Sequence, residues 1–385
     1  MWRHIASNAL SIFVVGLFLL GGLILWCIGR YEAEGPLTRA ICLQVAPGST
    51  LTRVAMQLEA EEAISSRAIF RMAGDYTEKA RELKAGSFLI PEGSSMAEIL
   101  DLVTASGQST CGTEVVYRVG VTELNVQVRE LDPETQRFVE RAEFVPAEEP
   151  LPEVYVSAKD TADTRYRIAI AEGVTSWQIV TSLRDIDVLS GPADEIPAEG
   201  AMAPDSYEVV PGTERQALVD AMVEAQSERL AGAWQNREEG LPYETPDEAL
   251  IMASIIEKET ALAEERGQVA SVFVNRLERG MRLQTDPTVI YGITRGQGVL
   301  GRGIRQSELR RETPWNTYVI DGLPPTPIAN PGLASIEAAL NPDETPFIFF
   351  VADGTGGHAF AETLAEHNEN VARWRAIEAE RANSE

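Results

Sequence analysis

Two glutamates at the end of an apolar segment are the first residues in this chain that could do acid–base chemistry. Residues 249–256 carry no charge and a single hydroxyl, on Ser254, and the triplet Glu257, Lys258 and Glu259 follows directly. A helix that is apolar on every side is expected to be buried. A carboxyl group at the end of such a helix is partly desolvated, which raises its pKa and lets it hold a proton near neutral pH. A group of this kind can serve as a general acid.

Helical geometry favours one of the two glutamates. With about 3.6 residues per turn, Glu259 lies on the same face as the bulkier apolar side chains of Met252, Ile255 and Ile256. Glu257 lies over mostly smaller side chains. We therefore favour Glu259 as the acid and keep Glu257 as the fallback. From this segment alone, the alternative that both are solvated charges at a helix end stays open, because perturbed carboxylates mark functional sites only statistically.

A polar segment follows the next predicted helix. Asp247 is expected to cap the first helix, and residues 269–280 are predicted to form a second one that ends at Gly280 and carries Asn275. Polar groups then gather with an aromatic ring, in Gln284, Thr285, Asp286, Thr288 and Tyr291. Such groups bond sugar hydroxyls and acetamides, and a ring packs on a pyranose face. These residues and Asn275 are therefore candidate saccharide ligands, with an ordinary Asp-Pro loop as the alternative.

The C-terminal third supplies further candidates. Five prolines fall within 19 positions between residues 324 and 342, and because proline fixes φ they predict a rigid wall rather than a flexible lid. Asn316, Tyr318 and Asn330 are candidate ligand-facing groups in this region. Residues 345–368 predict a strand at 347–351, a glycine-rich turn and a closing helix. The glycine spacing fits neither a Walker A nor a dinucleotide motif, so the turn is expected to position His358.

Composition excludes several classes of protein. The 385 residues contain 44% hydrophobic and 24% charged side chains, which indicates a globular chain of two or three domains. A formal net charge of −26 makes a nucleic acid partner unfavourable. The three histidines and three cysteines form no cluster with metal-ligand spacing, so neither a metal nor a cofactor is expected.

An N-terminal apolar segment predicts a membrane anchor. Residues 9–28 are uncharged and mostly apolar, which is enough to cross a hydrocarbon core of about 30 Å as a helix. Arg3 before it places the N-terminus in the cytoplasm, although Arg30 on the other side weakens that bias. A cleaved signal peptide is the rival interpretation, but the apolar segment is long and no A-x-A site follows closely. Beyond residue 35 the compartment is then oxidising, where Cys42 and Cys111 either pair or stay as thiols.

Two segments repeat the same local pattern. A strand, a glycine turn, a hydroxyl cap and a helix are predicted near 41–66 and again near 168–191, and a hairpin-like segment follows each, at 85–100 and 203–219. Each unit resembles the small LysM-like fold that binds N-acetylated sugars of cell walls. The alternative is a structural repeat without sugar contact. Residues 112–165 separate the copies and are interpreted as an acidic, partly ordered insert.

Four long motifs carry a more specific resemblance. They are ASIIEKET, VFVNRLERGMRLQTDPTVIYG, NTYVIDGLPPTPIANPG and FFVADGTGGHAF, in this order behind one anchor. The chain resembles the membrane-bound endolytic murein transglycosylases, the MltG or YceG-like family, closely over 245–370 and loosely over 40–110. It departs from the pattern in the insert and at 298–311. The resemblance implies an α+β fold: anchor 1–35, LysM-like module 36–112, insert 113–165, second βα module and linker 166–243, and catalytic domain 244–385.

The resemblance also implies a reaction. A lytic transglycosylase cleaves the bond between N-acetylmuramic acid and N-acetylglucosamine in peptidoglycan glycan strands without water, and the family's catalytic glutamate maps to Glu259. The expected partners are glycan strands, the inner membrane and peptidoglycan synthases, with the catalytic domain in the periplasm. The alternatives are a muramidase, which usually needs a second carboxylate such as Asp286, and a membrane-anchored sugar-binding scaffold without catalysis.

Overall fold

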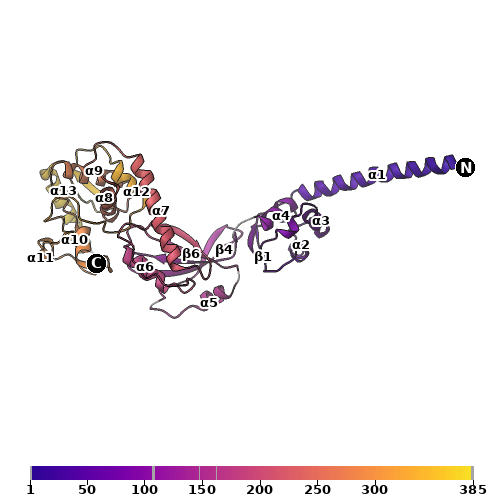
Figure 1. The fold of residues 1–385 in the computed structure, drawn as a ribbon, viewed down its shortest axis with the longest axis horizontal. Helices are drawn as coiled ribbons and strands as arrows, with labels where there is room; N and C mark the ends of the chain where they lie inside the picture. The colour runs from indigo at the N-terminus through magenta and orange to yellow at the C-terminus, as the bar shows by residue number, and fades with distance from the viewer. Residues whose placement is uncertain (1, 106–108, 147, 162, 383–385) are drawn as a thin grey trace. The chain divides into compact units, whose positions relative to one another are not determined.

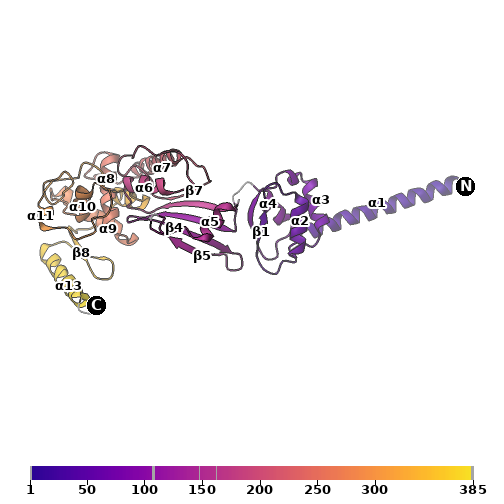
Figure 2. The same cartoon turned by 90° about the horizontal axis from the view of Figure 1, so that it is seen from below.

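The computed structural model describes residues 2–105, 109–146, 148–161 and 163–382. Helices and strands are mixed along this part of the chain, which confirms the predicted α+β class (Figures 1 and 2). The chain divides into two compact units. The first comprises Met1–Val115, Gln127–Glu143 and Leu151–Arg165, and the second Val116–Val126, Phe144–Pro150 and Tyr166–Glu385.

The N-terminal helix α1, Trp2–Glu32, contains the predicted apolar segment. Within the described residues, Phe13–Glu32 is long and apolar enough to cross a membrane, with a mean hydropathy of 2.1. Its large side chains are exposed in the structure, as 77% for Phe18 and 71% for Leu25 illustrate. A helix of this length with an apolar, unpacked surface fits a single membrane span.

The first unit contains a small domain with its own core. Strands β1 (Ile41–Val45) and β2 (Gly86–Ile90) pair antiparallel, with Leu43 opposite Phe88. The helices packed with them are α2 (Leu51–Ala60), α3 (Arg67–Tyr76) and α4 (Met96–Thr104), and a 3₁₀ turn spans Lys79–Arg81. Their buried side chains form one cluster that includes Leu58, Phe70 and Leu100. Cys42 and Cys111 form a disulfide, with Cα atoms 5.8 Å apart, so the pairing that the sequence left open occurs.

The repeated local pattern has a structural counterpart. Gly48 and Gly173 adopt positive φ angles of 76° and 77°, and Thr50 and Thr175 then cap the following helices through their hydroxyls. The second copy has no equivalent of α3 between its helix α6 (Ser176–Asp185) and strand β7 (Ser206–Val209). Its strand β6 (Arg165–Ile170) also belongs to a larger sheet. The LysM-like duplication is therefore not confirmed.

A five-stranded sheet has the order β5-β4-β3-β6-β7. Its first three strands in the chain lie within the predicted insert, as β3 (Thr113–Val119), β4 (Leu124–Asp132) and β5 (Arg137–Phe144). Helix α5 (Glu153–Asp160) follows them. Leu124, Val126 and Val128 are buried while the residues between them are partly exposed, which is the alternation of a strand with one face covered. The acidic composition of this segment conceals that alternation.

The remaining elements are mostly helical, and α8, Pro246–Glu259, lies among them (Figures 1 and 2). They are α7 (Arg215–Gln235), α9 (Arg266–Glu278), α10 (Asp286–Thr294), α11 (Gln306–Leu309), α12 (Leu333–Leu340), β8 (Phe349–Ala352), β9 (His358–Ala361) and α13 (Leu364–Ala382), with a 3₁₀ turn at Ala263–Glu265. Helix α8 packs on α7, α9, α10 and α12. All eight residues of 249–256 are buried, as predicted.

Two local predictions were wrong. Thr245, not Asp247, caps α8: its hydroxyl accepts from the Glu248 amide, the Glu248 carboxylate accepts from the Thr245 amide, and Pro246 starts the helix. This reciprocal arrangement satisfies two amides that Asp247 would leave free. The polar segment after Gly280 is a loop only as far as Thr285, because Asp286 already begins α10, in whose first turn Pro287 is favourable.

Candidate active site

Glu259 is the last residue of α8 and lies where the apolar helix ends. The Thr285 hydroxyl donates a hydrogen bond to its Oε1. Burial raises the pKa of the Glu259 carboxyl above its ordinary value, and the negative charge of Asp286 raises it further. The Thr285 hydrogen bond and the electrostatic influence of His358 and Arg276 lower this pKa without reversing the effect of burial. Burial thus favours the protonated form of this side chain, and Thr285 provides a hydrogen-bond partner for its charged form.

The backbone that presents Thr285 is held from two sides. The Thr285 amide donates to the Thr317 hydroxyl at 3.0 Å, and Thr317 shares a 2.8 Å hydrogen bond with the buried hydroxyl of Thr288. Arg276 of α9 donates through Nη1 to the Leu283 carbonyl and through Nε to the Ile348 carbonyl at 2.7 Å. The position of the Thr285 hydroxyl is thus fixed by residues that do not themselves face solvent.

A second carboxylate lies next to this one. Asp286 follows Thr285 directly and occupies the first turn of α10, where the helix dipole favours negative charge. The Tyr318 hydroxyl donates to Asp286 Oδ1 at 2.6 Å. Burial and the hydrogen bond to Asp286 raise the pKa of the Tyr318 hydroxyl, so this group stays protonated as a donor. Asp286 itself is exposed and can face a ligand with its other oxygen.

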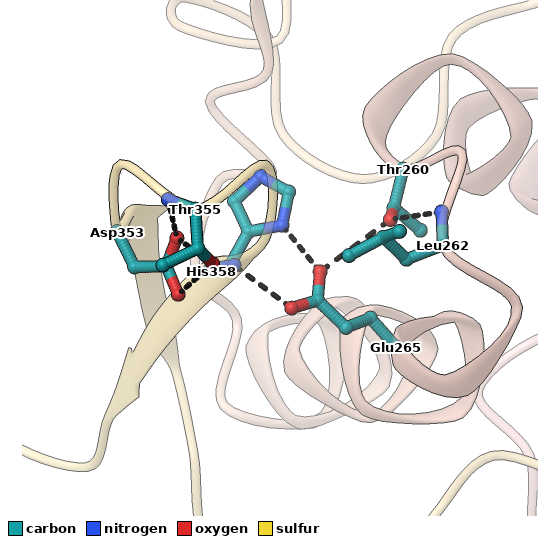
Figure 3. Close-up of polar contacts among 6 residues, drawn as sticks. All are labelled: Thr260, Leu262, Glu265, Asp353, Thr355 and His358. Atoms are coloured by element: carbon teal, nitrogen blue, oxygen red, sulfur yellow. Dashed lines mark hydrogen bonds and ion pairs between the residues drawn. The ribbon is translucent and has the colours of Figure 1, made fainter.

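Glu265 and His358 form a paired unit in the same region (Figure 3). Glu265 Oε2 lies 2.8 Å from His358 Nδ1, and Glu265 Oε1 accepts from the His358 amide at 2.8 Å. The side chains of His358 and Glu265 are 15% and 14% exposed. Gly357 allows this approach, because a Cβ at that position would collide with Glu265 Oε1. The carboxylate thereby fixes the orientation of the imidazole ring.

The turn before His358 has its own support. Asp353 accepts from the amide of Thr355 at 2.7 Å and from its hydroxyl at 2.8 Å, as Figure 3 shows. The Asp353 amide donates to the Gly357 carbonyl at 2.9 Å, which closes the turn between β8 and β9. The glycine-rich turn thus positions His358, the role that its glycines suggested.

Glu257 has a different environment from Glu259. Its Oε2 accepts from the Gly332 amide at 3.0 Å, and Gly332 is the N-cap residue of α12. The amides at a helix N-terminus have no partner within the helix, so a carboxylate there is stabilising. Glu257 is thus engaged in joining α8 to α12.

Several candidate ligand residues brace the backbone instead of pointing to Glu259. The Asn275 amide donates to the carbonyls of Thr345 and Phe347, both at 2.8 Å. Asn316 donates to three backbone carbonyls, and Asn330 is fully buried and bonds Val174 and Met202.

Two further candidates differ from these amides. Gln284 is exposed and has a φ of 50°. Its main-chain N–H donates to the Thr317 carbonyl at 3.2 Å, which leaves the side chain out of this contact. Tyr291 packs against Trp315, with ring centroids 5.8 Å apart, and its hydroxyl interacts with the partly buried carboxyl of Glu199. Gln284 is therefore open to a ligand, whereas Tyr291 is engaged with Glu199.

Sequence reasoning missed Arg276 and Glu265. Arg276 carried a usable signal, because it follows Val269 and Phe273 at helical spacing and so belongs to the buried face of α9. A buried arginine requires partners, which the structure supplies. Glu265 carried no signal, since its partner His358 is 93 residues away in the chain. Among the described residues, no group of three or more histidine, cysteine or acidic side chains could hold a metal ion.

Together these side chains can transfer a proton next to a developing positive charge. Glu259 can supply a proton from a partly buried carboxyl, Asp286 can supply negative charge, and Tyr318 and His358 can supply oriented polar groups. General acid catalysis followed by stabilisation of a cationic centre is the chemistry that such a site supports.

Comparisons with known proteins find similar sequences. The model of the YceG-like family matches residues 145–373. A Bacillus subtilis protein named endolytic murein transglycosylase is 45% identical over 119 residues, which are 31% of this chain and 32% of that protein. A protein of the same name from Streptococcus pneumoniae is 34% identical over 181 residues, 45% of this chain and 32% of that protein. The chain thus spans about a third of the length of the curated relatives it matches.

A solved structure is also similar. The crystal structure of a YceG-like protein from Listeria monocytogenes has a TM-score of 0.46 and 24% sequence identity. The similarity covers 86% of this chain and 99% of that one.

Proposed function

The chain belongs to the YceG-like family, and on that premise we propose that it is an endolytic lytic transglycosylase of peptidoglycan. It cleaves the bond between N-acetylmuramic acid and N-acetylglucosamine within glycan strands and leaves 1,6-anhydro ends. The observation that carries this proposal is the partly buried carboxyl of Glu259 with its raised pKa, at the end of a buried helix inside the segment that matches the family. The names of the relatives support the same activity.

The reaction needs one proton-carrying group. The Glu259 carboxyl donates its proton to the glycosidic oxygen, and the C1–O bond breaks with its electron pair going to that oxygen. The muramyl C1 becomes oxocarbenium-like, and the muramyl C6 oxygen then bonds to C1. The C6 hydroxyl proton passes to the Glu259 carboxylate, which restores the acid. No water is consumed, and protons and electrons balance over the cycle.

The environment of Glu259 suits both halves of this cycle. Its raised pKa favours the protonated form that begins the reaction. The hydrogen bond from Thr285 and the nearby Arg276 stabilise the carboxylate that must accept a proton afterwards. Asp286, held by Tyr318, supplies negative charge for the oxocarbenium-like carbon. Gln284 and His358 are the side chains that we assign to contact with the sugar.

The apolar helix supports a proposal for the location of the enzyme. We place α1 in the inner membrane, with the N-terminus in the cytoplasm and the catalytic region in the periplasm, where peptidoglycan lies. The disulfide between Cys42 and Cys111 suits an oxidising compartment. A membrane-anchored enzyme acts near the site of strand synthesis, so we propose that it ends the elongation of nascent strands and meets peptidoglycan synthases there.

Two other functions predict different products. A muramidase would use Asp286 for a water molecule and leave reducing ends. A sugar-binding scaffold would bind strands and never shorten them. Mass spectrometry of digested glycan strands separates the three, because a transglycosylase gives anhydromuramic ends.

Glu257 and Glu259 provide a matched pair of variants for the decisive test. Glu259→Gln removes the transferable proton and should abolish release of anhydro products while the fold is kept. Glu257→Gln keeps an oxygen for the Gly332 amide and should retain cleavage. Loss of activity in Glu257→Gln alone would instead make Glu257 the acid. Full cleavage by both variants would refute a mechanism based on this helix end.

A further inference from the structure

A cavity of about 350 Å³ adjoins the active site. On α8 its wall includes Lys258, the residue before Glu259, and on α10 it includes Pro287, the residue after Asp286. It continues along α10 past Ile290 and Thr294. A substrate bound at Glu259 and Asp286 can therefore extend into this cavity.

The polar side chains of the wall are already engaged with the protein. The Thr175 hydroxyl donates to the Gly296 carbonyl at 2.6 Å. Gln178 donates through Nε2 to the Val121 carbonyl at 2.5 Å and accepts from the Thr175 amide at 2.9 Å. Arg302 pairs with Glu308 at 2.6 Å. A sugar ring needs several free donors and acceptors, which these groups do not provide.

Lys258 is different, because its ammonium group retains free donors. It donates to the Gly173 carbonyl at 3.1 Å, which uses one of its three N–H bonds. Gly173 has a φ of 77° and no side chain, and an added Cβ would lie 3.4 Å from Lys258 Cδ. The lysine stem thus lies over this turn, and the ammonium group is held at the Gly173 carbonyl in the wall of the cavity.

The rest of the wall is largely apolar. Ile290, Val299 and Ile328 face the same space. The cavity therefore combines an aliphatic surface with two cations: Arg302, which pairs with Glu308, and Lys258, on whose ammonium group the charges of Glu257 and Glu199 act. A ligand that fits carries a carboxylate beside methyl groups, because a carboxylate satisfies the ammonium and methyl groups cover the apolar side chains.

We propose that this cavity binds the peptide stem of the glycan strand, with Lys258 paired to a stem carboxylate. This inference rests on the proposed function. It predicts that the enzyme is selective for glycan strands that carry peptide stems. The stem is attached to the muramyl residue, next to the bond that Glu259 cleaves. Its alternation of methyl groups and carboxylates matches the wall, whereas a further sugar ring does not.

The test compares two substrates with each enzyme. Glycan strands with intact stems and strands stripped of their stems by an amidase are digested by the wild type, Lys258→Met and Lys258→Arg. We expect the wild type to prefer intact strands roughly tenfold in kcat/KM, as a hydrogen-bonded charge pair permits. Lys258→Met should bring the ratio close to one, mainly through KM, and Lys258→Arg should restore part of it. The ratio of kcat/KM for intact strands to kcat/KM for stripped strands is not changed by a loss of activity that affects both substrates equally.

A matched control removes the same charge elsewhere. Lys84 is exposed and lies outside the cavity wall, so Lys84→Met should keep the wild-type ratio. An unchanged ratio in Lys258→Met, or no preference in the wild type while anhydro products form, would overturn the stem subsite and leave the transglycosylase intact. If neither substrate yields anhydro ends, the proposed function fails. Titration of a soluble stem peptide into wild type and Lys258→Met then decides the subsite separately, because equal binding by the two refutes it.

Discussion

The Thr285 hydroxyl donates a hydrogen bond to the Glu259 carboxyl group and so joins the segment before α10 to the end of α8. The two residues are 26 positions apart in the chain. The hydrogen bond favours the carboxylate, whereas burial favours the acid, and burial dominates. The reactivity of Glu259 is therefore set by two opposing effects that can be changed one at a time.

Thr285→Val removes the hydrogen bond and leaves a side chain of nearly the same shape. The pKa of Glu259 should then rise further, because the interaction that lowers it is gone. A general acid is active below its pKa, so the basic limb of kcat/KM should move to higher pH. Thr38→Val, at an exposed position, serves as control. A basic limb that does not move would show that Thr285 has no influence on the acid.

Glu259→Gln should stabilise the folded protein at neutral pH. The pKa of Glu259 is raised on folding above its ordinary value of 4.5. The folded state thus binds this proton more tightly, and the carboxyl destabilises the fold increasingly as pH rises above 4.5. The glutamine side chain resembles the protonated carboxyl. Glu259→Gln should therefore raise the free energy of unfolding by about 1 kcal/mol at neutral pH, and this difference should vanish below the ordinary pKa of a glutamate.

Urea unfolding at several pH values measures this difference. Glu264→Gln, at an exposed position, controls for the loss of one negative charge in an acidic chain. If Glu259→Gln were less stable than wild type at neutral pH, the carboxyl would not be the desolvated group described above.

Glu265→Gln should impair the reaction through His358. The Glu265 carboxylate can accept from both the amide and Nδ1 of His358, but glutamine has a single acceptor oxygen. The ring should therefore lose its fixed tautomer, and kcat/KM should fall about 10- to 100-fold with the ring misplaced. Nitrogen NMR reports the tautomer directly, and the chain has only three histidines to assign. An unchanged tautomer with unchanged activity would remove the pair from the site.

The disulfide should stabilise the first unit considerably. Cys42 and Cys111 are 69 positions apart in the chain. Closing a loop of this size lowers the entropy of the unfolded chain and so stabilises the folded state by about 4 kcal/mol. Cys42→Ser/Cys111→Ser should lower the unfolding temperature and abolish its sensitivity to reductant, whereas Cys27→Ser should change neither. Thiol counting on the unfolded, unreduced protein should find one free thiol, that of Cys27. Three free thiols would show that the pair does not form.

The sequence was sufficient to find the buried helix and the candidate acid. Both depend on short-range patterns, since eight uncharged residues predict burial and the next charges mark where burial ends. The helix start was missed by two residues because Thr245 and Glu248 cap it reciprocally, which Asp247 alone obscured. The strands of 113–165 were missed because they share no single pattern: β4 alternates buried and partly exposed residues, β3 is buried almost throughout, and β5 is exposed except at its end.

The roles of the polar side chains were harder to predict. An asparagine that contacts a sugar and an asparagine that braces a turn have the same sequence signature, because both supply one donor group and one acceptor. Only the fold shows that Asn275 donates to carbonyls near β8 and that Asn330 is enclosed. Likewise, the pairing of Glu265 with His358 depends on the turn between β8 and β9, which no local pattern specifies.

Asn330→Ala separates these two roles experimentally. Asn330 Oδ1 accepts from the Met202 amide at 2.9 Å, and its Nδ2 donates to the Val174 carbonyl at 2.9 Å. Alanine leaves the buried Met202 amide without this acceptor, so we expect the free energy of unfolding to fall by about 2 kcal/mol. KM measured well below the unfolding temperature should stay near the wild-type value. Asn341→Ala, at an exposed position, should change neither quantity. A raised KM with unchanged stability would instead make Asn330 a sugar ligand, since a binding contact affects the substrate complex and not the fold.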